Sequence, residues 1–151
     1  MNAYFNTFTR LAEYLEEVKA CARENGYTTT LFGRRRYFSG INSSAPFIRA
    51  HAERMAINAP VQGTAADVMR IAMNRVYEAI KDKNQFDTVR MMLQVHDEIV
   101  FEVQKDIVKD VVPRLVAIME SVLEEQDTHG VPLVVDVATG ANWTDLNAFE
   151  E

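Results

Sequence analysis

The chain has 151 residues, of which 48% are hydrophobic, carries a net charge of -6 and contains one cysteine. This length is sufficient for one compact domain, the single Cys21 excludes an internal disulfide, and the acidic balance argues against a protein that simply coats nucleic acid. No apolar run approaches the ~18 residues of a membrane span, and the amino terminus lacks the pattern of a secretion signal. We therefore expect a soluble, cytoplasmic protein. Cys21 is expected to be a reduced thiol that fills space as a small apolar side chain.

An amino-terminal helix is predicted between Ala3 and Asn25, because apolar side chains recur there every three or four positions. They are Phe8, Leu11, Leu15, Val18 and Ala22. The Asn25-Gly26 pair favours a stop, since glycine readily takes the left-handed conformation that ends many helices. Residues 27–31 and 35–38 are rich in β-branched and aromatic side chains and flank Gly33, which predicts a short β-hairpin with basic residues at its bend.

The middle of the chain predicts two helices. The first is expected to begin near Pro46, because proline fits a first helical turn, and to end or bend at Asn58-Ala59-Pro60. The second is expected to run from Thr64 toward Lys83, because Thr64 and Asp67 resemble a capping pair. Its buried stripe is predicted to contain Ala65, Val68, Ala72, Val76 and Ala79.

A second hairpin is predicted from residues 89–94 and 99–103, where Ile99, Phe101 and Val103 alternate with Val100 and Glu102. The turn falls near His96 and Asp97, so a tight loop is expected to display these two side chains and Glu98.

The last third of the chain predicts a helix and a strand. Apolar side chains recur at helical spacing from Ile107 to Leu123, and Pro113 must either kink this helix or mark its true start. Residues 133–137 alternate in a way that predicts a third core strand ending at Gly140. Trp143 is expected to pack the terminus onto the body of the protein.

The order of these elements predicts an α+β fold, in which a small antiparallel sheet of β-hairpins packs against several helices. The chain contains hairpins rather than repeated strand-helix-strand crossovers, which are typical of parallel sheets. One compact unit is expected.

The charges are unevenly distributed along the chain. Residues 1–83 hold 12 basic and 8 acidic side chains, whereas residues 84–151 hold 4 and 14. From Arg34 to Arg54 the chain carries Arg34, Arg35, Arg36, Arg49 and Arg54 but only one acid, Glu53. This local excess of arginine is suited to binding phosphate groups. The excess of acidic residues in the second half is explained by an ordinary solvated surface.

Three polar residues in the middle of the chain are spaced four apart: Arg54, Asn58 and Gln62. A nearly continuous helix would project them along one side, where a guanidinium and two carboxamides could meet phosphate, sugar or base edges. Ordinary exposed polar residues around a helix break are the simpler explanation of this spacing alone.

The segment from Gln94 to Val100 is the most informative, because the favoured two-residue hairpin turns carry Asn-Gly or Asp-Gly rather than His-Asp. Adjacent carboxylates at the end of a rigid hairpin are suited to a hard cation such as Mg²⁺, with Asp97 as the better ligand. Spacing alone favours a solvated polar turn over a metal site by about twofold. The His-Asp dipeptide also occurs in metal-dependent phosphohydrolases. Such an enzyme would need further metal ligands on helices, and the only other histidines in the sequence are His51 and His129.

Three ordered motifs resemble the family A DNA polymerases. They are Thr-Leu-Phe-Gly-Arg-Arg-Arg at 30–36, Ala-Glu-Arg at 52–54 followed by Ile-Asn-Ala-Pro-Val-Gln-Gly-Thr-Ala-Ala-Asp at 57–67, and Val-His-Asp-Glu at 95–98. The similarity covers nearly the whole chain, including the amino-terminal helix and residues 131–143. By this resemblance, residues 1–45 would be a fingers helix with the basic hairpin, and residues 46–151 part of the palm.

The resemblance also implies roles for individual residues. Asp97 would be a palm carboxylate that helps to hold the catalytic metal ions, Glu98 its less essential neighbour, and His96 a contact near the primer's terminal nucleotide. The remaining site residues are implied to contact DNA: Arg54, Asn58 and Gln62 in the minor groove, and Arg34, Arg35 and Arg36 near the backbone.

The implied reaction is template-dependent nucleotidyl transfer with two Mg²⁺ ions, primer-template DNA and deoxynucleoside triphosphates. A second palm carboxylate motif and the nucleotide-binding fingers helix have no counterpart in the sequence, so we expect this carboxy-terminal portion to be inactive alone. The alternative is a non-catalytic module that completes a split polymerase by binding the missing amino-terminal portion, or that self-associates through its exposed partner surface.

Overall fold

The computed structural model describes residues 2–149, with side chains described from residue 5 onward. The chain divides into two compact units, Met1–Asp67 and Val68–Glu151. Both combine helices with two-stranded antiparallel sheets, which confirms the predicted α+β class. Within the described residues, no helix is long and apolar enough to cross a membrane. The proposed fingers and palm portions, residues 1–45 and 46–151, stay a prediction.

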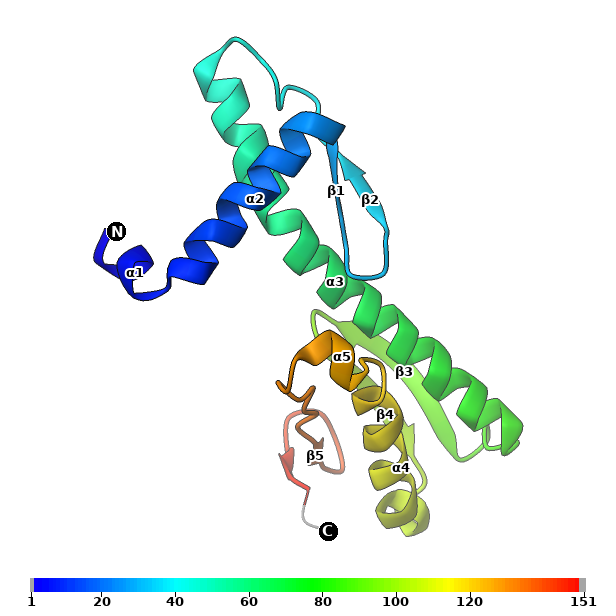
Figure 1. Cartoon of the computed structure of the whole chain (residues 1–151). Helices are drawn as coiled ribbons and strands as arrows, with labels where there is room; N and C mark the ends of the chain where they lie inside the picture. Colours follow the sequence, from blue (N-terminus) through cyan, green and yellow to red (C-terminus); the bar gives the residue numbers. More distant parts are fainter. Residues whose placement is uncertain (1, 150–151) are drawn as a thin grey trace. The chain divides into compact units, whose positions relative to one another are not determined.

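The first unit begins with α1 (Asn2–Thr7) and α2 (Thr9–Asn25), as Figure 1 shows in blue. Gly26 ends α2 in the left-handed conformation with φ of 77°, and its N–H donates to the carbonyl of Ala22 at 2.9 Å. This confirms the predicted stop. The strands β1 (Tyr27–Thr29) and β2 (Arg35–Tyr37) follow as an antiparallel hairpin, also as predicted.

The core of the first unit is built largely from small residues. Within this unit, three alanines on α3 (Pro46–Asp82) are buried: Ala52, Ala56 and Ala59. They form one cluster with Ala22 of α2 and with Phe38 and Ile41, which follow β2. Because alanine adds little bulk to a helix surface, α2 and the loop after β2 can approach the backbone of α3 closely. Cys21 does not join this core, since it is exposed, so its prediction as an apolar filler is wrong.

Helix α3 continues through Pro60 and is drawn as one ribbon from cyan to green in Figure 1. The prediction that a separate helix begins at Thr64 is therefore wrong. Thr64 Oγ1 accepts a hydrogen bond from the N–H of Leu31 at 3.0 Å instead of capping a helix. Proline costs about 3 kcal/mol inside a helix, and burial of the neighbouring Ala56 and Ala59 offsets part of that cost.

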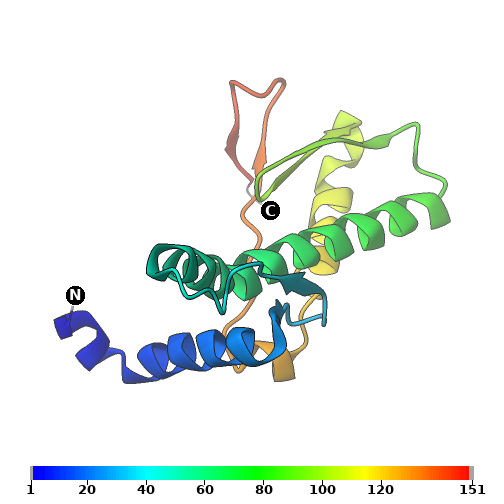
Figure 2. The ribbon, with the colours of Figure 1, turned by 90° about the horizontal axis from the view of Figure 1, so that it is seen from above.

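The second unit packs a hairpin and a helix against the carboxy-terminal half of α3 (Figures 1 and 2). The hairpin consists of β3 (Val89–Val95) and β4 (Glu98–Val103), and a 3-10 turn (Lys105–Ile107) leads into α4 (Val108–Glu120). Buried side chains from α3, β3 and α4 form the core: Val76, Ile80, Val89, Val111 and Leu115. The short elements α5 (Glu125–Thr128), β5 (Ala138–Thr139) and β6 (Asn147–Ala148) complete the unit.

Three predictions for the second unit are corrected or refined. Helix α4 begins at Val108, so Pro113 lies inside it rather than at its start. Residues 133–137 do not form a strand, and Val135 donates its N–H to the Glu120 carboxylate at 3.0 Å; of the strand predicted to end at Gly140, only β5 (Ala138–Thr139) is present. Trp143 does not pack the terminus onto the body, since 54% of its surface is exposed.

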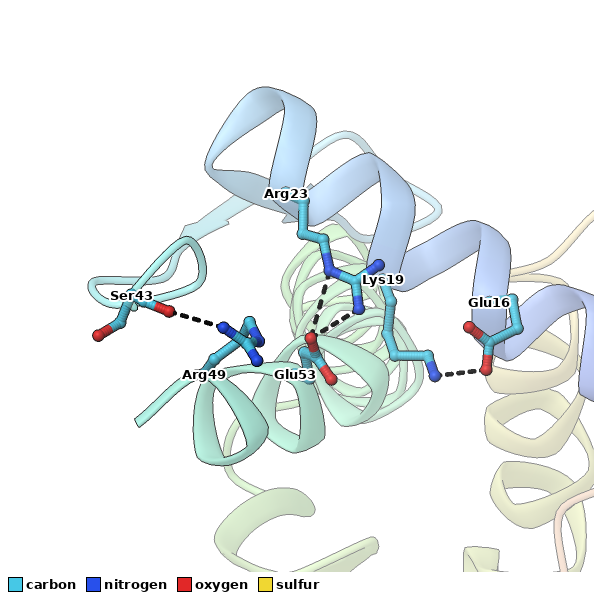
Figure 3. Close-up of polar contacts among 6 residues, drawn as sticks. All are labelled: Glu16, Lys19, Arg23, Ser43, Arg49 and Glu53. Atoms are coloured by element: carbon cyan, nitrogen blue, oxygen red, sulfur yellow. Dashed lines mark hydrogen bonds and ion pairs between the residues drawn. The ribbon is translucent and has the colours of Figure 1, made fainter. Parts of the chain in front are cut away.

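An ion pair joins α2 to α3 in the first unit (Figure 3). Arg23 donates to the same carboxylate oxygen of Glu53 through Nη2 at 2.6 Å and through Nε at 3.2 Å. The figure also shows Arg49 donating to the carbonyl of Ser43, and Lys19 paired with Glu16. The hydrogen bonds from Arg23 lower the pKa of Glu53, which outweighs the opposing effect of burial.

We predict that this pair makes the stability of the chain acid-sensitive. Because the folded-state pKa of Glu53 lies below the ordinary glutamate value of about 4.3, the pair stabilises the fold above that pH and is lost as the pH falls through the folded pKa. Urea unfolding should show that the wild type loses about 0.5–1 kcal/mol more than Glu53→Gln between pH 7 and pH 3. Glu24→Gln, at an exposed position on α2, is the matched control and should behave as the wild type. Equal acid sensitivity in the wild type and Glu53→Gln would contradict this role.

Candidate functional site

The β1–β2 hairpin is fastened to α3 by hydrogen bonds from its tip. Arg34 Nε donates to Asp67 Oδ1 at 2.8 Å, and Arg34 Nη2 donates to the carbonyl of Gly63 at 3.0 Å. The backbone N–H of Arg34 also donates to Thr30 Oγ1 at 3.1 Å, and Leu31 is bonded to Thr64 on α3. The Arg34 guanidinium therefore attaches the hairpin to one turn of α3 by donating to two acceptors on that helix.

Gly63 allows this close approach. A Cβ atom added at position 63 would lie 2.6 Å from Thr30 Cγ2 and 3.3 Å from Arg34 Nη2. A glycine inside a helix costs about 1 kcal/mol relative to alanine, and here that cost is offset by the contact between helix and hairpin. Position 63 requires a glycine for reasons of space, because the methyl group of Thr30 occupies the volume that a side chain at position 63 would need.

A hollow lies between the hairpin and α3 beside this attachment. Its lining includes threonines of the hairpin, two of the arginines and one of the predicted α3 contacts: Thr28, Thr29, Thr30, Arg34, Arg36 and Gln62. Thr28 is buried, and within the described residues its hydroxyl has no hydrogen-bond partner. The structure thus brings Gln62 of α3 close to the basic hairpin.

Three of the predicted DNA contacts follow one exposed side of α3. Arg54, Asn58 and Gln62 are all exposed and lie within the same uninterrupted helix. A four-residue spacing places side chains in a nearly straight row on a helix. The continuous helix on which such a row depends is present, and the contact of these side chains with DNA stays a prediction.

The three arginines of the hairpin differ in their surroundings. Arg34 is used for attachment to α3, as described above. Arg35 lies with its Cζ 4.7 Å from the ring centroid of Tyr27, and a hydrogen bond with the Tyr37 side chain raises the pKa of its guanidinium. Arg36 lies over Phe38 at 5.8 Å. The role of these arginines near DNA phosphates stays a prediction.

The predicted metal ligand lies on the turn of the β3–β4 hairpin. Val95 pairs directly with Glu98, so His96 and Asp97 alone form the turn, as predicted. His96 has φ of 54°, a left-handed conformation that costs a non-glycine residue about 1–2 kcal/mol. Gln94 Nε2 donates to the carbonyl of His96 and supports this conformation. The side chains of all three predicted residues, His96, Asp97 and Glu98, are exposed.

The donor set at this turn fits part of a magnesium site. Asp97 and Glu98 provide carboxylate oxygens, the ligands that Mg²⁺ prefers, and they are accessible from solvent. Within the residues that the structure describes, no group of three or more His, Cys, Asp or Glu side chains gathers to hold a metal. The turn belongs to the second unit, whereas the arginines and the α3 row belong to the first.

The sequence interpretation missed three residues of the hairpin attachment. Thr64 and Asp67 were interpreted as a local cap, although each binds a residue 33 positions earlier. Gly63 did carry a usable signal, because a glycine within a helical pattern often marks a close backbone approach.

The known protein family that matches this chain is described as DNA polymerase family A, and the match covers residues 1–145. The chain belongs to DNA polymerase family A. This confirms the resemblance inferred from the three motifs.

Curated family A relatives are much longer than this chain. The DNA polymerase I of Rhizobium leguminosarum is 45% identical over 144 residues, which are 95% of this chain and 14% of the relative. The DNA polymerase I of Caldicellulosiruptor bescii is 42% identical over 146 residues, or 95% of this chain and 16% of the relative. The chain therefore spans about a sixth or less of the length of these relatives.

A solved family A structure shares the fold. The POL domain of Pol1 from M. smegmatis, in complex with DNA primer-template and dNTP, superimposes with a TM-score of 0.77 at 41% identity. The match covers 82% of this chain and 22% of that one.

We predict that Arg34 acts mainly by attaching the hairpin to α3. Arg34→Lys removes the forked geometry that reaches Asp67 and Gly63 together, and should cost about 1 kcal/mol of local stability because Arg34 is partly exposed. Hydrogen exchange at the amides of Leu31, Gly33 and Arg34 should become roughly fivefold faster. Arg36→Lys is the matched control and should leave these amides unchanged. Equal acceleration in both variants would contradict the assignment.

Proposed function

We propose that this chain provides part of the active centre of a DNA-directed DNA polymerase, with Asp97 as a Mg²⁺ ligand and α3 facing primer-template DNA. The observation that carries the proposal is the exposed two-residue turn at His96 and Asp97 in a chain that matches the family over residues 1–145. The strained backbone of His96 supports it, because such strain persists most often at functional sites.

Asp97 is proposed to hold Mg²⁺ through its carboxylate, jointly with carboxylates outside this chain. In nucleotidyl transfer, bound Mg²⁺ ions supply activation of the primer 3′-hydroxyl and neutralisation of charge at the departing pyrophosphate. Glu98 is proposed as a less essential neighbour that adds negative charge at the turn. His96 is proposed to contact the primer near its terminal nucleotide.

The exposed row on α3 is proposed to read the minor groove of the primer-template duplex. Every base pair presents acceptors at its minor-groove edge, so donors from Arg54, Asn58 and Gln62 could bond to any sequence. Such contacts suit an enzyme that must accept every correctly paired base. The guanidinium groups of Arg35 and Arg36 are proposed to lie near the phosphate backbone of DNA. Arg34, which is bonded to α3, is proposed to add positive charge to the same surface.

The isolated chain is proposed to be inactive. Phosphoryl transfer depends almost entirely on positioning and charge neutralisation, so an incomplete ligand set without a nucleotide-gripping helix should lose many orders of magnitude in rate. DNA primer-template and deoxynucleoside triphosphates are therefore proposed as partners of the enzyme that contains this segment.

A second candidate function is a module that completes a split polymerase by binding the missing amino-terminal portion, or that self-associates. Its support is a set of exposed apolar side chains on the second unit: Met92, Leu93, Val131 and Val134 are 55%, 41%, 71% and 66% exposed. Covering such side chains with a partner removes them from water, which favours association.

We predict that primer extension requires both this chain and an amino-terminal polymerase portion. The chain alone should incorporate no nucleotide, whereas mixing it with an amino-terminal fragment of the M. smegmatis Pol1 POL domain should restore extension. In the mixture, Asp97→Asn should lower the rate by about 100-fold or more, the scale of losing one stabilising charge. Asp106→Asn, an exposed acid of the same unit, is the control and should keep the activity. Extension by the chain alone, lost in Asp97→Asn, would contradict the proposal.

We also predict weak metal binding at the turn, which is measurable without activity. Mn²⁺ as a paramagnetic substitute for Mg²⁺ should broaden the amide resonances of His96, Asp97 and Glu98 at millimolar concentration, the weak affinity expected of a site with few carboxylates. Asp97→Asn should abolish the selective broadening, while Asp106→Asn should preserve it. Broadening centred elsewhere on the chain would argue against Asp97 as the ligand.

A further inference from the structure

The β1–β2 hairpin has two faces with different roles. Direct cross-strand pairs alternate between them, with Thr28 opposite Arg36 and Tyr27 opposite Tyr37. Thr28 is buried and, with Arg36, lines the hollow beside α3, so this face of the hairpin is directed toward the helix. Because side chains alternate along a strand, Tyr27, Tyr37 and Arg35 are directed away from α3.

The outward face presents two aromatic rings and a guanidinium in contact. The ring centroids of Tyr27 and Tyr37 are 5.3 Å apart with an interplanar angle of 58°. Arg35 packs on Tyr27 with its Cζ 4.7 Å from the ring centroid. Tyr37 is 67% exposed, so most of its ring remains open to a ligand.

Cross-strand aromatic pairs and cation–π contacts also stabilise hairpins, and this explains part of the arrangement. It does not explain the basic charge that accompanies the open ring. Residues 27–38 contain three arginines and no acidic side chain. Within the described part of the chain, neither Arg35 nor Arg36 forms an ion pair, so their charges are available to an anionic partner.

We propose that the Tyr27–Arg35–Tyr37 face binds single-stranded DNA, with a base stacked on Tyr37 and a neighbouring phosphate bound by Arg35. Charge complementarity favours a nucleic-acid strand, and an exposed ring beside arginines is the usual arrangement for sequence-tolerant stacking. Bases of an intact duplex are already stacked on their neighbours, so an open ring suits an unpaired strand. The inference rests on the proposed function, because a primer-template supplies unpaired template.

The test separates stacking from charge. Fluorescence anisotropy compares binding of the 151-residue chain to an oligothymidylate and to an abasic strand with the same number of phosphates. The wild type should bind the oligothymidylate about tenfold more tightly, the effect of one stacked base. Tyr37→Ala should remove this preference, whereas Tyr37→Phe, which keeps the ring, should retain it.

Two controls complete the design. Arg35→Ala should weaken binding to both strands by the same factor, because phosphate contacts carry no base dependence. Tyr77→Ala removes a tyrosine of the second unit that is 50% exposed, and should leave the preference unchanged. Circular dichroism verifies folding of each variant.

Equal affinity of the wild type for both strands, or a preference that persists in Tyr37→Ala, would overturn the inference. Either result leaves the dependence of primer extension on Asp97 untouched, so failure of this inference is distinguishable from failure of the proposed function.

Discussion

The first unit depends on the close approach of the β1–β2 hairpin to α3 at Gly63. The methyl group of Thr30 occupies the space of a side chain at that position, and Arg34 bridges to the adjacent carbonyl and to Asp67. This approach closes the hollow beside Gln62 and decides which face of the hairpin is turned outward. The close approach at Gly63 and the Arg34 bonds together position the basic residues and the aromatic pair of the hairpin relative to α3.

Helix α3 runs through both units and buries a different kind of side chain in each. Its 37 residues bury small alanines in the first unit and larger side chains, Val76 and Ile80, in the second. Small residues let α2 and the hairpin lie close to the helix axis, while the larger ones fill the space under β3 and α4. Arg54, Asn58 and Gln62 remain exposed on the same helix, so one element provides both the core and the proposed DNA-facing surface.

The sequence predicted the features whose cause is local. The stop of α2 at Gly26, both hairpins and the turn at His96 depend on residues close together in the chain. Predictions failed where residues distant in the sequence determine the local structure. Thr64 and Asp67 bind the hairpin 33 residues away instead of capping a helix. Pro60 lies inside α3, because packing of the neighbouring residues supports the helix there. Residues 133–137 alternate like a strand, yet alternation does not provide a pairing partner. The exposed position of the Asp97 side chain was predictable, but the attachment role of Arg34 was not.

The central claim is that the Asp97 carboxylate binds a catalytic metal ion beside primer-template DNA. The most direct measurement is anomalous scattering from Mn²⁺ in a crystal of this chain combined with an amino-terminal polymerase portion, primer-template and nucleotide. We expect an anomalous peak within coordination distance of an Asp97 oxygen, about 2.1 Å, with the exposed side of α3 against the minor groove. A metal ion bound near the nucleotide without Asp97, or an Asp97 carboxylate remote from the primer terminus, would contradict it.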